Sequence, residues 1–171
     1  VDGAPPLTRK SYLRAHSNNL TADTREPVFA ALLEQEDSAD DIGDDATLST
    51  ALAEAYRERV TDALVPVEGV EPMLAELREE YQLGLLTNGP VLAQRSKLTH
   101  LGWTDAFDAA LVTGELPAGK PDRTAFEALL DALDSEPAAT VFVGDRVGDD
   151  IEGAANAGLV PIQVRYDGGP D

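Results

Sequence analysis

Acidic residues gather in one short segment where the sequence pattern changes from strand to helix. Asp145 follows residues 140–143, a run of β-branched and aromatic residues that predicts a buried strand. Asp149 and Asp150 come at the start of a helical pattern. We therefore expect Asp145 at the carboxyl end of a strand and the other two acids at the start of the next helix. In open α/β sheets this edge is where ligands bind.

Three carboxylates so close together repel one another unless a cation or a proton lies among them. Hard oxygen ligands at a strand end suit Mg²⁺, which takes one or two carboxylates together with water and substrate phosphate. The alternative is that Asp149 or Asp150 caps the helix, since Asp is favoured at helix N-termini, and for either residue alone this is the simpler interpretation. Capping does not account for Asp145, which lies on the strand side of the turn.

Two other turns bring polar groups to strand ends. The turn at 87–89, Thr-Asn-Gly, follows a predicted strand and offers hydroxyl, amide and backbone donors to a phosphate, although Asn-Gly is also a common turn. The segment GELPAGKP at 114–121 nearly matches the phosphate-binding loop GxxxxGK[ST], but Pro121 replaces the Ser/Thr and has no N–H. What remains is Lys120 before a helix, either placed to hold an anion or an ordinary surface lysine.

Helices and strands alternate in the second part of the chain. The patterns predict helices at 68–81, 91–101, 121–133 and 149–159, and strands at 83–86, 107–112, 140–143 and 160–164. Repeated β–α units imply a parallel sheet with helices on both faces. The helix at 68–81 is expected to turn Val70, Met73, Leu74 and Leu77 inward.

The first part of the chain lacks strand patterns. Helices are expected at 7–20, from Pro27 onward and after an N-cap at Ser49 or Thr50, with an acidic loop at 34–45. We therefore expect two parts: helical residues 1–66, and an α/β, Rossmann-like part at 67–171.

Charge and composition exclude several classes of protein. The 171 residues include 32 acids and 13 Lys or Arg, for a net charge of −19, but 43% are hydrophobic, enough for a core. This balance is typical of a halophile's cytoplasmic protein and argues against binding to nucleic acid or anionic membranes. The chain has no cysteine, no apolar run of membrane-spanning length and no signal peptide, so we expect a soluble cytoplasmic protein.

Three motifs in order, LLTNGP, GKPD and VFVGDRVGDDIEGA, resemble the haloacid dehalogenase-like hydrolase superfamily. The resemblance covers residues 67–165, and the preceding helices resemble that family's helical cap. It implies that Thr87, with Asn88 and Gly89, binds the phosphate of the substrate. It also implies that Lys120 offsets negative charge on the nucleophile and the phosphoryl group.

The resemblance further assigns the acids of the last motif to Mg²⁺. Asp145 would hold the ion most directly, supported by Asp150 or Asp149, and the GD…DI form of the motif favours Asp150. The implied activity is Mg²⁺-dependent hydrolysis of small phosphorylated metabolites through an aspartyl-phosphate. Two alternatives stay open: a metal-independent 2-haloacid dehalogenase, which the acid cluster disfavours, and an inactive fragment or non-catalytic binding protein.

One family motif is missing from the sequence. The DxDxT motif supplies the aspartate nucleophile of the family. Only Val-Asp-Gly-Ala at 1–4 resembles it weakly, and there no strand precedes and two prolines follow. We expect that residues 1–8 belong to the helical cap and that the nucleophile strand lies before them, so that this chain is incomplete at its N-terminus and inactive alone. The strands at 83–86 and 140–143 should then flank a gap one strand wide. We expect residues before Val1, or another segment such as one from a neighbouring copy, to fill it.

Overall fold

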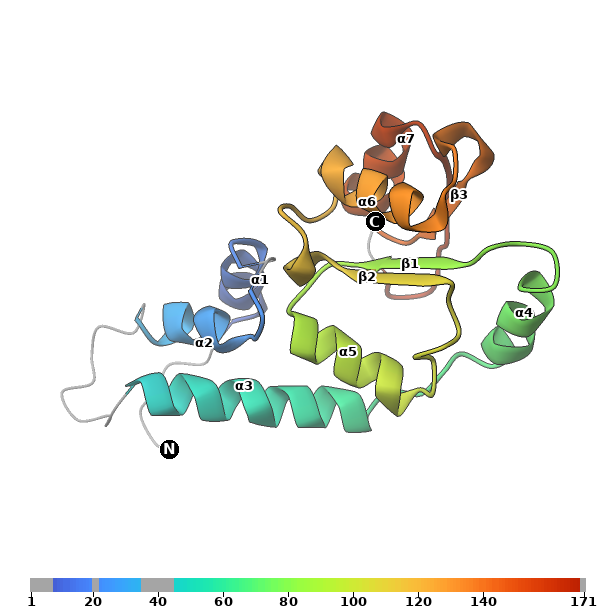
Figure 1. Ribbon diagram of the computed structural model, residues 1–171. Coiled ribbons are helices and arrows are strands. Elements are labelled where there is room, and N and C mark those ends of the chain that lie inside the picture. The colour runs from blue at the N-terminus through green and yellow to red at the C-terminus, as the bar shows by residue number, and fades with distance from the viewer. Residues whose placement is uncertain (1–7, 20–21, 35–44, 170–171) are drawn as a thin grey trace.

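The computed structural model describes residues 8–19, 22–34 and 45–169. Within these ranges the chain begins with three helices, α1 (Arg9–Ser17), α2 (Glu26–Leu33) and α3 (Asp45–Asp62), which stand beside an α/β part (Figure 1). The predicted helices are present. The weak resemblance to DxDxT at 1–4 lies outside the described residues, as does nearly all of the predicted acidic loop.

The start of α3 differs from the prediction. The helix begins at Asp45, and Ser49 and Thr50 lie inside it rather than capping it. Both hydroxyls donate hydrogen bonds to the carbonyl of Ala46, at 3.0 and 2.9 Å. Ser and Thr side chains can satisfy a carbonyl of the preceding turn as well as cap a helix, and a sequence pattern does not separate the two uses.

The helical part has its own apolar cluster. Its buried members come from all three helices, and they are Ala15, Val28, Phe29, Leu32 and Ala53. The rings of Tyr12 and Tyr56 pack beside them, with their centroids 5.7 Å apart. Proline in the first turn of α2 suits its position, because the first turn needs no intrahelical N–H there.

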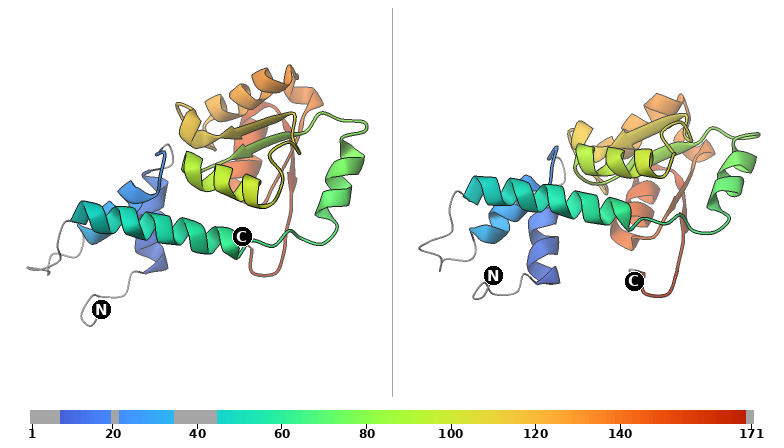
Figure 2. Two further views of the ribbon diagram at one scale, coloured as in Figure 1. Left: turned by 60° about the horizontal axis from the view of Figure 1, so that its bottom comes forward. Right: turned by 90° about the horizontal axis from the view of Figure 1, so that it is seen from below.

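The α/β part follows the predicted order of elements. It contains α4 (Val70–Leu77), β1 (Gly84–Thr87), α5 (Val91–His100), β2 (Ala109–Val112), the short η1 (Thr113–Glu115), α6 (Arg123–Leu133), the short η2 (Pro137–Ala139), β3 (Val141–Gly144), a π-helical turn η3 (Val147–Glu152), α7 (Gly153–Ala157) and β4 (Val160–Gln163). Helices lie on both sides of the strands, with α6 and α7 on one side and α5 on the other (Figures 1 and 2). The α/β fold class is confirmed.

The four strands form two parallel pairs. β1 pairs with β2, Gly84 opposite Ala109, and β3 pairs with β4, Val141 opposite Val160. Among the described residues β1 and β3 are not hydrogen-bonded to each other, as expected if they flank a gap. One edge of β1 and one edge of β3 therefore have no strand partner in this part of the chain.

Helix α6 is the centre of the larger apolar cluster. Its amphipathic pattern buries Phe126 completely, against the ring of Phe142 on β3 at a centroid distance of 5.1 Å. The Asp122 carboxylate caps the helix by accepting from the N–H of Thr124 at 2.9 Å, and this hydrogen bond lowers the pKa of Asp122. Since α6 also covers β1, it joins the two strand pairs.

The predicted inward face of α4 is wrong for the described residues. None of the helix is buried, and Met73 is 47% exposed. One face of the β3–β4 pair is similarly open: Val143 and Ile162, which lie side by side, are 57% and 49% exposed. Both faces have the apolar pattern of packed surfaces, but the described residues do not supply the layer that would cover them.

No helix among the described residues is long and apolar enough to cross a membrane.

Candidate active site

The turn after β1 is held by side chains from two neighbouring elements. Gln94 of α5 donates to the Thr87 hydroxyl oxygen and to the Asn88 carbonyl, both at 2.7 Å. The N–H of Gly89 donates to the hydroxyl of Thr113 at 3.2 Å, and Thr113 is fully buried just after β2. Gly89 has a φ of 138°, which favours glycine. The turn is therefore a fixed structure.

Gln94 and Thr113 were not identified from the sequence. Thr113 follows Val112, which lies opposite Thr87 in the β1–β2 register, so a polar residue just after a strand was a signal for it. Gln94 had no signal of its own, because a glutamine in the first turns of a helix is usually exposed.

Asn88 connects this turn to the loop before α6. Its side-chain nitrogen donates to the carbonyl of Lys120 at 2.8 Å, and the N–H of Lys120 donates to its side-chain oxygen at 2.9 Å. This reciprocal pair fixes the backbone of Lys120 beside β1. The sequence predicted Asn88 as a phosphate donor; the structure gives its side chain a positioning contact, and phosphate binding by its backbone stays a prediction.

The side chain of Lys120 is buried in an ion pair. Its Nζ lies 2.6 Å from Oδ1 of Asp150 and 5.2 Å from the centroid of the Phe142 ring, and both charged side chains are at most 10% exposed. The interpretation of Lys120 as a surface lysine is wrong. Removing one partner of such a pair typically costs about 3–5 kcal/mol, because the other charge stays buried.

Asp150 is packed tightly against the end of β3. A Cβ atom added at Gly144 would lie 2.5 Å from the Cβ of Asp150, so glycine is required there. The second carboxylate oxygen of Asp150 accepts from the N–H of Arg146 at 3.0 Å. The carboxylate is therefore held between the Lys120 ammonium and the backbone of the turn after β3.

The other two acids have separate partners. Asp145 accepts from the hydroxyl of Tyr166 at 3.0 Å, a contact that raises the pKa of Tyr166. Asp149 is 3.1 Å from Nε of Arg146. Neither Asp149 nor Asp150 caps the helix that follows, which begins with the π-helical turn η3 and has no side-chain cap. π-Helical turns are frequent at functional sites.

The assignment of Asp145, Asp149 and Asp150 to Mg²⁺ stays a prediction. The described residues contain no group of three acidic, His or Cys side chains arranged to hold a metal ion. Two of the acids are in ion pairs, Asp150 with Lys120 and Asp149 with Arg146. The donors still fit Mg²⁺, because Asp145 is a partly exposed carboxylate at a strand end, and this ion needs only one or two carboxylates besides water and phosphate.

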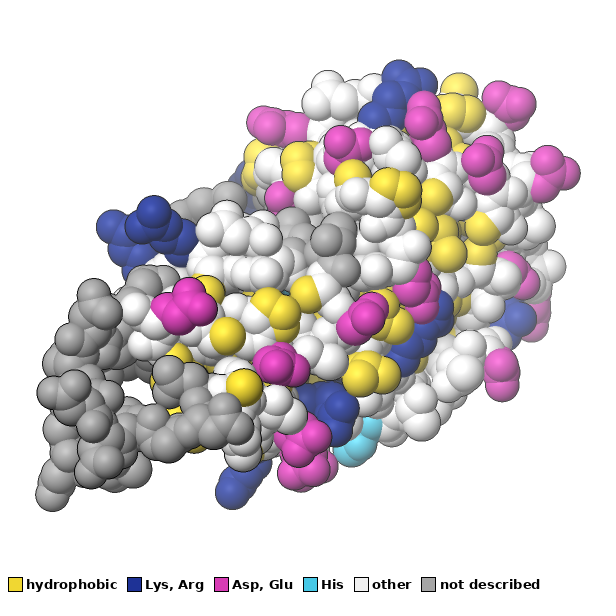
Figure 3. All heavy atoms as spheres, turned by 60° about the vertical axis from the view of Figure 1, so that its left-hand side comes forward, with side chains coloured by type: hydrophobic (Ala, Val, Ile, Leu, Met, Phe, Trp, Pro, Cys, Tyr) yellow, Lys and Arg dark blue, Asp and Glu magenta, His cyan; other side chains and the backbone are white. Residues whose placement is uncertain are grey.

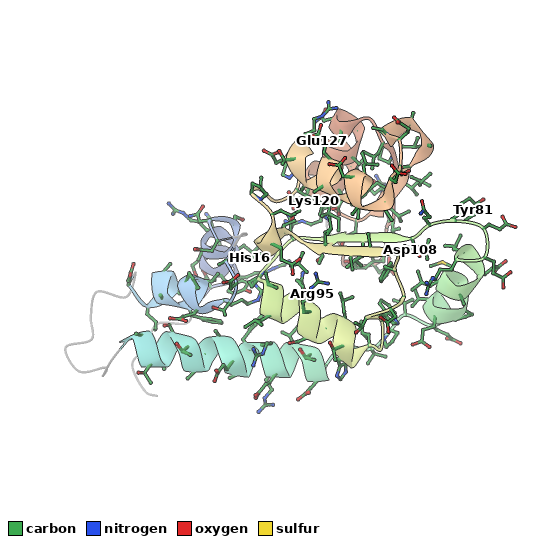
Figure 4. All side chains as sticks on the ribbon, viewed as in Figure 1. His16, Tyr81, Arg95, Asp108, Lys120 and Glu127 are labelled. Atoms are coloured by element: carbon green, nitrogen blue, oxygen red, sulfur yellow. The ribbon has the colours of Figure 1, made fainter. Side chains whose placement is uncertain are left out.

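The three predicted motifs thus meet at one place. The turn after β1 bonds to the loop of Lys120, and Lys120 bonds to Asp150 after β3. In Figure 4, Lys120 lies at the end of β1 and β2 that faces α1, where His16 also lies. Contacts between backbone, amide and charged groups therefore join the carboxyl ends of both strand pairs.

The sequence matches the model of a known family. The profile of the haloacid dehalogenase-like hydrolase family matches residues 7–158. The chain belongs to this family. Similar proteins include the N-acylneuraminate-9-phosphatase of Rattus norvegicus (41% identical over 60% of this chain and 42% of the relative), the glyceraldehyde 3-phosphate phosphatase of Methanopyrus kandleri (34%, 69% and 51%) and the phosphoserine phosphatase of Thermus thermophilus (37%, 82% and 54%). The chain spans about half the length of these relatives.

Solved structures of family members superpose on the chain. A phosphatase from Thermococcus onnurineus has a TM-score of 0.64 at 30% identity, covering 73% of this chain and 61% of its own. A 2-haloacid dehalogenase from Pseudomonas syringae has a TM-score of 0.69 at 27% identity, covering 95% and 71%. The fold is thus shared by members named for two different reactions.

Proposed function

We propose that the full-length protein is a Mg²⁺-dependent phosphatase acting on phosphate esters of small metabolites. The observation that supports it most is the contact chain from the turn at Thr87 through Lys120 to Asp150. Backbone and hydroxyl donors, an ammonium group and carboxylates at one sheet edge suit a phosphoryl group with a cation. The relatives at 34–41% identity, which are named as phosphatases of three different metabolites, favour the same reaction.

The hydrogen bonds indicate which protons are available to a substrate. The Thr87 oxygen accepts from Gln94, so its own proton is free to be donated to a phosphoryl oxygen. The ammonium of Lys120 has three N–H groups and donates one hydrogen bond to Asp150. The other two N–H groups can donate to the nucleophile and to the phosphate. Asp145 would hold Mg²⁺, supported by Asp150 or Asp149, and bound Mg²⁺ would neutralise charge on the phosphoryl oxygens.

We place the nucleophile on a further parallel strand between β1 and β3. Those strands each have an edge without a strand partner among the described residues, and their carboxyl ends carry the site. An aspartate at the end of such a strand would attack phosphorus and break the ester P–O bond, and the leaving oxygen would take a proton from a general acid. Water would then hydrolyse the aspartyl-phosphate, releasing phosphate and restoring the carboxylate.

Hydrolysis of an aryl phosphate by the full-length protein tests this function. We expect turnover with Mg²⁺ and none with a chelator. Thr87→Val removes the hydroxyl at nearly constant shape and should lower kcat by about 10²-fold or more. Thr99→Val on the exposed side of α5 is the matched control and should retain activity within about twofold. Absence of Mg²⁺-dependent turnover would exclude the proposal.

A metal-independent 2-haloacid dehalogenase is the second candidate, since the superposed structure from Pseudomonas syringae has that activity in its name. The full-length protein incubated with 2-chloropropionate and a chelator distinguishes the two reactions. We expect no halide release. Halide release without metal would replace the phosphatase proposal, and no turnover of either substrate would favour a non-catalytic binding protein.

A further inference from the structure

A buried arginine in the helical part has no acidic partner among the described residues. Arg25 precedes α2 and is 9% exposed. Its Nη1 donates to the hydroxyl of Tyr12 and lies 3.3 Å from Nδ1 of His16, and its guanidinium carbon lies 5.1 Å from the centroid of the Tyr56 ring. None of these neighbours carries a negative charge. His16 is also neutral near pH 7, because burial and then the charge of Arg25 lower its pKa to about 4. A buried charge held only by neutral groups costs free energy.

Two more cations line the space around Arg25. A cleft of about 90 Å³ between α2, α3 and α5 is lined by Arg25 and Arg57, and a smaller hollow of about 10 Å³ is lined by both arginines and Lys97. Burial, and next the charge of Arg25, lowers the pKa of Lys97. None of the three cations forms an ion pair within the described ranges, although Glu26 and Glu54 also line the cleft.

We call the larger cleft, lined by Arg25 and Arg57, together with the small hollow that Lys97 also lines, the cationic pocket. It is next to the candidate active site. The carbonyl of Asp23 accepts from the N–H of Leu92, which fixes the loop before α2 on the first turn of α5. Two residues later, Gln94 holds the turn of Thr87. The same turn of α5 therefore borders both places.

The loop after β3 also reaches this region. Arg146 of that loop is near enough to His16 to contribute to the lowering of its pKa. Figure 4 likewise shows His16 at the end of the strands where Lys120 lies. His16, which contacts Arg25 of the pocket, therefore lies near the end of the strands that carries the candidate active site.

We propose that the cationic pocket binds a carboxylate of the substrate, so that the enzyme acts on phosphate esters of hydroxy acids. This inference rests on the proposed phosphatase function. A guanidinium presents paired N–H groups that match a carboxylate, and the aromatic and imidazole groups hold Arg25 in one place before binding. A carboxylate bound in the pocket would be the counter-ion that Arg25 lacks among the described residues.

Two three-carbon esters that differ at C1 test the inference with the full-length protein and Mg²⁺. One is 3-phosphoglycerate, with a carboxylate, and the other is glycerol 3-phosphate, with an alcohol. We expect kcat/KM to be at least tenfold higher for the carboxylate ester. Arg57→Gln should remove most of this preference by raising KM for 3-phosphoglycerate, and should leave glycerol 3-phosphate within about twofold. Arg59→Gln, an exposed position on the same helix, is the matched control and should change neither.

Arg25→Lys keeps a charge at the buried position and should also reduce the preference, since an ammonium lacks the paired donors. A purely structural role of Arg25 and Arg57 predicts equal losses for both esters, and that result overturns the inference. Equal kcat/KM for the two esters in the wild type overturns it as well. An aryl phosphate distinguishes failure of the carboxylate-binding inference from failure of the phosphatase proposal. If the aryl phosphate is not hydrolysed either, the proposed phosphatase function is wrong.

Binding gives a readout that does not need turnover. The chain has two histidines, His16 beside the pocket and His100 at the far end of α5. In NMR spectra, 3-phosphoglycerate should shift the ring signals of His16 and leave those of His100 unchanged, and glycerol 3-phosphate should have a much smaller effect. Equal shifts of His16 with both esters would contradict carboxylate binding beside Arg25.

Discussion

At the scale of single residues, the site depends on close contacts that few side chains allow. The first is the approach of Asp150 to the end of β3 at Gly144. The ion pair with Lys120 requires Asp150 to lie against the strand, and a glycine makes the space. The same loop contains a second glycine, Gly148, where an added Cβ atom would meet nothing within 4 Å. The two positions therefore form a natural comparison.

We predict that Gly144→Ala destabilises the protein by about 1–3 kcal/mol, because the new methyl group overlaps Asp150. Gly148→Ala should change the free energy of unfolding by less than about 0.5 kcal/mol. Urea unfolding of both variants measures the difference. Equal stability of the two would show that Asp150 is not packed on the strand end as described.

His16 gives a second prediction at this scale. Its pKa is lowered from 6.5 to about 4 by burial and by Arg25, so the unfolded chain binds a proton there before the folded chain does. Its contribution to stability is complete above pH 6.5 and is lost as the pH falls toward 4. Because the ring is only partly buried, solvent screening reduces the loss below the value that the shift alone implies.

Urea unfolding at several pH values, in the wild type and in His16→Gln, checks this prediction. Protonation of carboxylates changes both proteins alike, so the difference between them isolates His16. The wild type should lose stability relative to His16→Gln between pH 6.5 and 4. Parallel pH profiles would contradict the described surroundings of the ring, and His100→Gln serves as the control at an exposed histidine.

At the scale of elements, the open strand edges are the feature that most needs a partner. One edge of β1 and one of β3 have unpaired backbone groups among the described residues, and unpaired buried groups cost about 1–3 kcal/mol each. The apolar faces of α4 and of the β3–β4 pair are exposed as well. These features are consistent with packing against further elements.

We predict that a strand between β1 and β3 protects both edges in the full-length protein. Hydrogen exchange followed by NMR tests this within one molecule. Amides of β1 and β3 that do not bond to β2 or β4 should exchange as slowly as those that do, and far more slowly than loop amides. Exchange at loop rates at these edges would remove the proposed place of the nucleophile.

Most of the helices and strands could be predicted from the sequence, because the spacing of apolar residues indicates local secondary structure. The order of helices and strands, their parallel pairing and the strand ends at Thr87 and Asp145 follow from apolar patterns and turns. Contacts between side chains that are distant in the sequence do not follow from these patterns. The pairing of Asn88 with the Lys120 backbone and the cationic pocket of Arg25 depend on how loops meet in space, and no spacing rule encodes that.

At the scale of the whole molecule, charge is the dominant property. Acidic side chains are spread over the face seen in Figure 3, among fewer basic ones and scattered apolar ones. The exposed ion pairs that exist, such as Arg95 with Glu115 at 2.9 Å, are each worth about 0–1 kcal/mol. These ion pairs leave the net charge of −19 unchanged. Repulsion between the excess carboxylates is therefore stronger in the compact folded state than in the expanded unfolded state.

We therefore predict that the melting temperature rises as KCl increases from millimolar to molar concentrations. The Debye length falls from about 30 Å at 0.01 M to about 3 Å at 1 M, so screening removes most repulsion between surface carboxylates. Sucrose at equal osmolarity is the control for solvent exclusion, since it stabilises compact states without screening charge. A triple variant that neutralises the exposed acids Glu76, Glu79 and Glu80 should have a smaller salt increment, because less repulsion is left to screen. If KCl leaves the melting temperature unchanged, or if sucrose raises it equally, charge repulsion does not limit the stability of this fold, and the acidic composition has another cause.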